Sequence, residues 1–243
     1  MASKAHPPTR RKPAARAPVR RTRAAATAPG TAERILDAAE KLFAESGYDG
    51  VSLRQITREA KVELALANYH FGPKLELFRA VVRRRAQALN AERLAALDAL
   101  PEGAAIEDLI AAFTGPFLER SQRGGPGWKD YARVIAQTAN SPRWTLEIMA
   151  AEFDPVADEF IRRVRRSFPG AAAADVYWSF HFLLGAMTIT FADTGRIDAL
   201  SGGRCRTADL DAIHARMIPF LSAGFRALCQ SSSPLRRRRP RAR

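Results

Sequence analysis

The residues best suited to chemistry in this sequence are gathered between positions 52 and 74, and their types suit contacts to nucleic acid better than catalysis. Asn68 carries an amide that matches the donor and acceptor edge of adenine, and Tyr69 and His70 beside it can bond to phosphate or to a base. Ser52 and Arg54 bring a hydroxyl and a guanidinium, which suit phosphate oxygens. The full set of expected contact residues is Ser52, Arg54, Leu64, Ala65, Leu66, Asn68, Tyr69, His70 and Lys74.

Two short helices joined by a turn would bring these side chains to one surface. Ser52 followed three residues later by Gln55 forms a capping-box pattern and predicts a helix start. A break at 61–63 leads into a second short helix over 64–70, which Phe71-Gly72-Pro73 closes. In a helix-turn-helix the second helix enters the major groove of DNA, so we expect Leu64 or Ala65 to meet thymine methyl groups.

The residues around this segment closely resemble the N-terminal domain of TetR-family repressors. The matching runs are ILDAAEKLFAESGY at 35–48, VSLRQI at 51–56 and ANYHFGPK at 67–74. The resemblance implies a DNA-binding three-helix domain followed by a helical body that dimerises and senses a small molecule. Asn-Tyr-His-Phe at 68–71 is most similar to a subgroup that includes fatty-acid-responsive repressors.

Two positions depart from the family pattern. Lys61 stands where the family usually has glycine in the turn, so this residue must adopt the turn conformation at some energetic cost. Leu64 and Leu66 replace polar residues that many relatives present to bases. Specificity is therefore expected to depend on Asn68, Tyr69, His70, methyl contacts and DNA shape.

Helical periodicity begins at Thr31, an expected N-cap, and continues through the body of the chain. Beyond Pro73 the pattern predicts helices at about 74–98, 105–121, 127–139, 143–167, 172–193 and 207–229, and no strand. We therefore predict an all-α protein of about nine helices. The expected organisation is a helix-turn-helix domain over 31–78 and an effector-binding and dimerisation bundle over 79–230.

The net charge of +14 suggests a polyanionic partner, and its whole excess lies in the two ends of the chain. Residues 1–30 and 231–243 are rich in arginine, contain no acidic residue and hold few large apolar side chains. We expect both tails to be disordered. They would either grip phosphates without sequence preference or simply keep the protein soluble.

The body offers candidates for a subunit interface and for a ligand site. The apolar helix at 172–193 and the striped last helix suggest a two-fold dimer through Phe180, Leu184, Met187, Leu210, Ile213, Met217, Leu221 and Phe225, with intrachain core as the alternative. Aromatic residues on the preceding helices suggest a pocket for an unknown, largely apolar effector. Its expected lining is Phe113, Phe117, Trp128, Tyr131, Gln137, Trp144, Met149, Phe153 and His181, although each aromatic suits an ordinary core as well.

Other classes of function find little support. The sequence holds none of the GxSxG, HExxH, GxGxxG or P-loop motifs, and its four histidines have no metal-ligand spacing, so we expect neither catalysis nor a metal or cofactor. The apolar run 176–192 is too short for a membrane span, and no apolar export signal follows the basic N-terminus, which points to the cytoplasm. The competing hypothesis is an architectural protein that binds DNA without sequence preference through its tails.

Overall fold

The structure is a computed structural model that describes residues 30–230, so the two tails, apart from Gly30, lie outside the described residues. The helices of the expected DNA-binding domain, which we call the reading end, are α1 (Thr31–Ser46), α2 (Leu53–Ala60) and α3 (Leu64–Phe71). Those of the body are α4 (Lys74–Asp98), α5 (Ile106–Arg123), α6 (Pro126–Ala139), α7 (Pro142–Trp144), α8 (Ala150–Ser167), α9 (Ala173–Ala192), α10 (Arg196–Leu200) and α11 (Leu210–Cys229). A π-helical turn, η1 (Thr145–Met149), joins α7 to α8.

The all-α prediction is confirmed over the described range. Nine of these helices have eight residues or more, and residues 30–230 contain no strand. The bounds of α4 are those predicted, whereas the single helix expected over 143–167 is divided by the π-helical turn. Such a turn inserts one extra residue into the helical ladder, which the periodicity of the sequence does not reveal.

The sequence rules for helix ends account for the start of α2. Gln55 N–H donates to the Ser52 hydroxyl at 3.3 Å, and the Gln55 side chain accepts from Ser52 N–H at 2.8 Å, so the capping box is complete. The start of α1 differs from the expectation, because Gly30 occupies the N-cap position and Thr31 is the first helical residue. No side chain caps α1.

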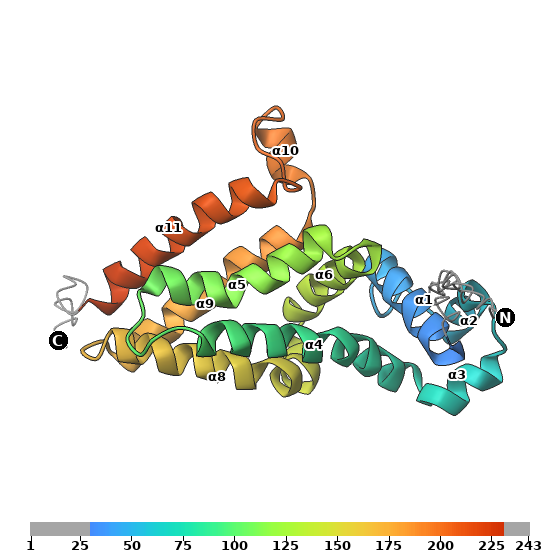
Figure 1. Cartoon of the computed structure of the whole chain (residues 1–243). Helices are drawn as coiled ribbons and strands as arrows, with labels where there is room; N and C mark the ends of the chain where they lie inside the picture. Colours follow the sequence, from blue (N-terminus) through green and yellow to red (C-terminus); the bar gives the residue numbers. More distant parts are fainter. Residues whose placement is uncertain (1–29, 231–243) are drawn as a thin grey trace, which may run out of the picture.

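The helices of the reading end lie at one end of an elongated molecule (Figure 1). α4 starts at this end and runs into the body, where α5, α8, α9 and α11 lie around and above it. α10 and the loops beside it project away from the bundle (Figure 1). The end of α11 lies at the extremity opposite α1–α3.

The expected boundary between domains, at 78/79, falls inside the continuous α4. α1 is attached to this helix by Glu40, which is 1% exposed and accepts hydrogen bonds from Arg84 at 3.1 Å and from Arg85 at 2.7 Å. Arg84 also pairs with Asp37 at 2.8 Å. We call Glu40, Arg84 and Arg85 the α1–α4 junction. It joins the reading end to the body through buried charge.

Lys61, the residue that departs from glycine in the turn, has φ 54° and ψ 51°, the left-handed conformation. A residue with a β-carbon pays about 1–2 kcal/mol there, whereas glycine does not. The lysine side chain is exposed and makes no ion pair within residues 30–230, so little offsets this strain.

We therefore expect Lys61→Gly to stabilise the protein by about 0.5–1 kcal/mol, after the greater backbone entropy of glycine in the unfolded chain is subtracted. Thermal unfolding measures this change. Lys61→Val is the matched control, because a β-branched residue at positive φ should lower the melting temperature. A melting temperature lower for Lys61→Gly than for the wild type would contradict the strain assigned to Lys61.

Candidate DNA interface and effector site

α3 presents one buried side and one open side. Ala67 is buried against α1, α2 and α4, while Leu64 and Phe71 are half-buried and hold the helix in place. On the opposite side the side chains of Asn68 and His70 are exposed, and that of Tyr69 is 83% exposed. Ala65 and Leu66 are also exposed. The packing that fixes α3 therefore uses none of the three polar side chains expected to contact DNA.

α2 and the turn after it place exposed basic side chains near α3. Arg54, which the sequence singled out, is exposed, and Arg58 and Lys61 lie farther along the same segment. Within residues 30–230 none of these three cations has an ion-pair partner. Arg58, Lys61 and Arg34 line a surface groove of about 440 Å³ beside Leu66. The sequence reasoning missed Arg34 and Arg58, although basic residues flanking a helix-turn-helix are a usable signal for phosphate contacts.

Lys74, which was expected to bind phosphate, makes contacts that stabilise the fold. Its ammonium donates to the carbonyls of Tyr48 and Val51, both at 2.9 Å, and lies 4.0 Å from the centre of the Tyr48 ring. These contacts fasten the α1–α2 loop to the start of α4. Since an ammonium has three donors, one remains for phosphate, and the expected DNA contact stays a prediction.

Four of the nine residues expected around a ligand come together inside the body. Phe113 and Phe117 on α5 and Trp128 and Tyr131 on α6 are all buried. The Phe117 ring centre lies 6.1 Å from that of Tyr131, and the Trp128 ring centre 5.7 Å from it. Phe160, Phe180 and Phe191 extend this group, with Phe191 at 4.0 Å from Phe117. We call these seven residues the aromatic cluster.

The other expected pocket residues lie elsewhere. The Trp144 ring lies edge-on to the Tyr48 ring with their centres 4.7 Å apart, and Gln137 donates to the Ala44 carbonyl at 3.0 Å, so both contact the reading end. His181 is exposed on α9, beside Trp178, and does not face the aromatic cluster. The expectation that it lines an interior pocket is wrong, because a helix that is apolar all round gives no sign of which side faces inward. Met149 and Phe153 are half-buried at the α8 end of the body.

Most of the residues expected at the subunit interface lie in the core of the chain instead. Phe180, Met187, Met217, Leu221 and Phe225 are buried within the chain itself, as the intrachain alternative had it. Ile213 is half-buried and Leu184 is exposed, while the side chain of Leu210 lies outside the described part of the chain.

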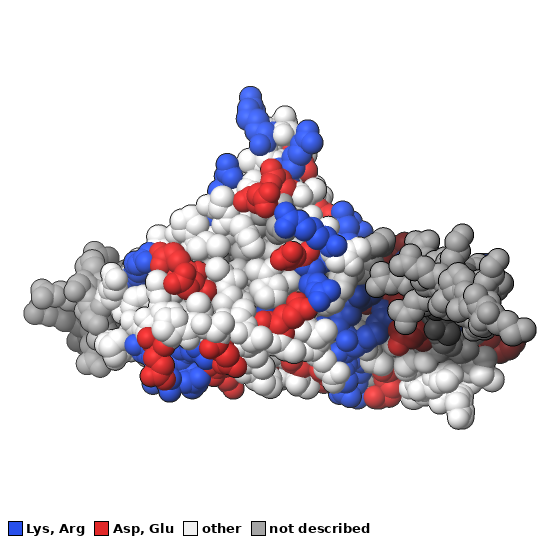
Figure 2. Space-filling model, viewed as in Figure 1, with Lys and Arg blue, Asp and Glu red and all other residues white. Residues whose placement is uncertain are grey.

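The exposed apolar residues of α9 and α11 are a different set, which we call the α9/α11 face: Tyr177, Trp178, Phe182, Leu184, Ile189 and Phe220. On α11 the exposed side chains between Arg216 and Arg226 are all uncharged. In Figure 2 an uncharged band lies over α11 and α5, between charged groups at both ends.

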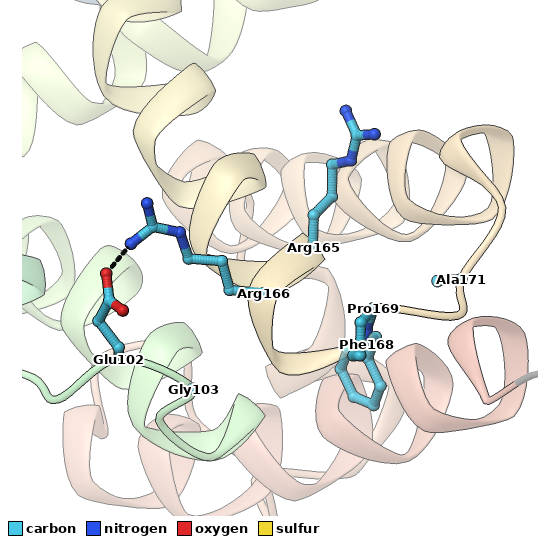
Figure 3. A pocket seen from close by; sticks show the side chains of 7 residues that line it. All are labelled: Glu102, Gly103, Arg165, Arg166, Phe168, Pro169 and Ala171. Atoms are coloured by element: carbon cyan, nitrogen blue, oxygen red, sulfur yellow. Dashed lines mark hydrogen bonds and ion pairs between the residues drawn. The ribbon is translucent and has the colours of Figure 1, made fainter.

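Two hollows lie away from the aromatic cluster. One, of about 880 Å³, is lined by residues of α9, α11 and the loop after α10, among them Ile189, Phe220 and Cys205. The other, of about 710 Å³, lies at the end of the bundle far from α3, where an ion pair between Arg166 and Glu102 closes one side (Figure 3). Neither contains a residue of the expected ligand site.

Chemical groups for metal binding are not assembled in the described part of the chain. No group of three or more His, Cys, Asp or Glu side chains there is placed to hold a metal ion. None of the helices between residues 30 and 230 is long and apolar enough to cross a membrane.

Similarity to known proteins follows the division between the reading end and the body. Residues 35–81 match the family model described as bacterial regulatory proteins, tetR family, and residues 111–224 match the tetracyclin repressor-like C-terminal domain. Two regulators from Pseudomonas putida, SrpR and the uncharacterised TtgW, are each 39% identical over 66 residues. That stretch is 27% of this chain and only 31% and 49% of those proteins.

Solved structures share the fold over most of the chain. FadR from Bacillus subtilis, in complex with stearoyl-CoA, has a TM-score of 0.56 and 14% identity over 79% of this chain and 98% of its own. The ketosteroid regulator KstR2 of Mycobacterium tuberculosis has a TM-score of 0.58 and 16% identity over 83% and 98%. At these identities the likeness concerns the fold. With both family models matched in their proper order along the sequence, this chain belongs to the TetR family of transcriptional regulators.

Proposed function

We propose that this chain is a dimeric repressor that reads an operator through α3 and is released from it by a small, largely apolar molecule. The observation that carries the proposal is the open side of α3. Asn68, Tyr69 and His70 are exposed, while the buried Ala67 and the half-buried Leu64 and Phe71 hold the helix that carries them. Exposed polar side chains on a rigid helix suit direct reading of a major groove.

A dimer is supported by the α9/α11 face. Phe220 is 76% exposed and Trp178 is 57% exposed, and Phe220 lines one hollow together with Ile189 of α9. Exposed apolar residues that gather in a patch mark an interaction site in soluble proteins. A two-fold axis through this face would give the assembly two copies of α3. Two α3 helices that lie one helical turn of DNA apart, or a multiple of it, fit a palindromic operator.

Release by a ligand is supported by the connections between body and reading end. α6 contributes Trp128 and Tyr131 to the aromatic cluster, and its Gln137 bonds to Ala44 of α1. A ligand that binds two arrangements of α6 with different affinity would change the position of α1 and with it the spacing of the two α3 helices. The lining suggests an effector that is mainly apolar.

The architectural alternative has less support, since both family matches lie between residues 35 and 224 and the tails are not involved. Regulators of this family are generally not enzymes. A repressor acts on the chromosome, so we assign the protein to the cytoplasm.

The first test replaces Asn68 and Tyr69 by alanine. Duplexes selected by the wild-type protein from a random pool supply the operator. We expect each variant to bind it about 5- to 150-fold more weakly, the range for a lost base contact of 1–3 kcal/mol. Melting temperatures should stay at the wild-type value, because both side chains are exposed.

Leu146→Ala is the matched control, since this exposed apolar residue lies on η1 and not on α3. It should bind the selected duplex as the wild type does. Selection that enriches no sequence at all would overturn the repressor proposal, and unchanged affinity of both α3 variants would remove α3 as the reading helix.

The second test introduces Phe220→Arg. A charge at the centre of an apolar interface is left unpaired when the interface closes, so we expect the dimer to dissociate at concentrations at least tenfold higher than for the wild type. Sedimentation measures the oligomeric state, and operator affinity should fall in parallel. Leu146→Arg makes the same chemical change outside the face and should leave the dimer intact; equal effects of the two variants would rule out the α9/α11 face.

A further inference from the structure

Arg93 lies in the core of the body, where the sequence pattern calls for an apolar residue. It is 4% exposed and occupies α4 one turn from Leu89 and one turn from Leu97, both fully buried. Residues four apart share one face of a helix. A guanidinium therefore points from an apolar stripe of α4 toward α5.

The contacts of Arg93 orient it toward the aromatic cluster. Its Nε donates to the Phe113 carbonyl at 2.9 Å, near the point where Pro116 interrupts the hydrogen bonding of α5. The carbon of the guanidinium lies 4.5 Å from the centre of the Phe113 ring and 5.5 Å from that of Phe117. The electron-rich faces of the two rings attract a cation but supply no negative charge.

No carboxylate compensates this charge. Within residues 30–230 Arg93 has no ion pair, and its neighbour Glu92 is engaged by Arg120. The other buried or half-buried arginines differ in this respect, since Arg84 and Arg85 both pair with Glu40. A guanidinium has five N–H donors, and the Nε–H bond to Phe113 is the one hydrogen bond that the Arg93 side chain makes to the described residues.

The group is nevertheless charged at neutral pH. Burial lowers the pKa of Arg93 to about 10, which is still well above 7. Neutral polar neighbours do not supply the missing negative charge. Tyr131 uses its hydroxyl to donate to the Val82 carbonyl at 2.9 Å, and the buried Oδ1 of Asn90, which lacks a partner, carries no formal charge. A buried charge without a counter-ion is unfavourable, so the site as it stands favours an anion.

We propose that Arg93 is the anion-binding group of the effector site and that the effector is an amphipathic monocarboxylate. The planar fork of the guanidinium matches a carboxylate through two parallel hydrogen bonds. Phe113, Phe117 and Tyr131 would contact the apolar part of the molecule. A polyanion is disfavoured because Arg93 is the one cation here without a carboxylate partner among the described residues: Arg85 and Arg120, which lie over Trp128, are paired with Glu40 and Glu92. This inference rests on the proposed effector site in the body.

The test compares decanoate with decanol, which has the same chain length and no charge. Binding to the full-length protein is measured by calorimetry and by the shift in melting temperature. We expect the wild type to prefer decanoate, and Arg93→Met to reduce the ratio of the two affinities by about 10- to 150-fold, the range for hydrogen bonds to charged groups. Arg93→Lys keeps the charge without the fork and should retain part of the preference.

Two controls separate this role from a structural one. Arg165→Met alters an exposed arginine at the far end of α8 and should leave the ratio unchanged. Arg93→Met without ligand should melt at or above the wild-type temperature, because removal of an uncompensated buried charge is neutral or stabilising. A lower melting temperature together with an unchanged ratio would show that Arg93 serves only to pack α4 against α5.

Failure of this inference can be distinguished from failure of the repressor proposal. Equal affinities of the wild type for decanoate and decanol, or binding of neither, would overturn the carboxylate assignment while leaving recognition of the selected operator intact. We expect Arg93→Met to bind that operator like the wild type in the absence of ligand. Loss of operator binding by Arg93→Met at an unchanged melting temperature would contradict a role confined to the effector.

Discussion

The arrangement of reading end and body depends on the buried carboxylate of Glu40. Removed from water, this group is stable only because Arg84 and Arg85 of α4 both donate to it, and loss of one partner in such a cluster typically destabilises a protein by about 3–5 kcal/mol. These directional bonds and the buried apolar face of α1 together fix the rotation of α1 about its own axis. Because α2 and α3 pack on α1, the direction of the open face of α3 follows from this junction.

The same helix carries the junction and Arg93. Eight residues separate Arg85 from Arg93, about 12 Å along an α-helix, so one continuous rod connects the reading end to the uncompensated charge in the body. α6 forms a second connection, from the aromatic cluster to the Ala44 carbonyl. A displacement of α4 relative to α6 would therefore act on α1 at two points. Two attachments convert a small shift in the body into a rotation of the reading end, whereas a single attachment would allow α1 to remain behind.

Local features of the structure were the ones that sequence predicted best, although the N-cap of α1 is Gly30 and not Thr31. The capping box at Ser52, the strained Lys61 and the bounds of α4 depend on neighbouring residues and were predicted correctly. Features that depend on which side of an apolar helix faces inward were not predicted correctly. α9 is apolar on every side, so Phe180 was assigned to the interface although it lies in the core, and His181 was assigned to a pocket although it is exposed. Arg93 left a usable signal, a charge within the stripe of Leu89 and Leu97.

The different surroundings of the inner and outer sides of α9 explain why this helix is apolar on every side. Its inner side, with Leu183 and Met187, packs in the core of the chain, and its outer side, with Trp178 and Ile189, is open in the single chain. If a second copy covers that outer side, α9 lies between two apolar surfaces and is held by both, so a shift of α5 or α6 against its inner side is transmitted to the partner subunit. A polar outer side of α9 would keep a single chain soluble. It would not pack against a second copy, so a movement in one subunit would not be passed to the reading end of the other. The exposed aromatic residues are thus better explained by the need to keep two α3 helices in register than by the stability of one subunit.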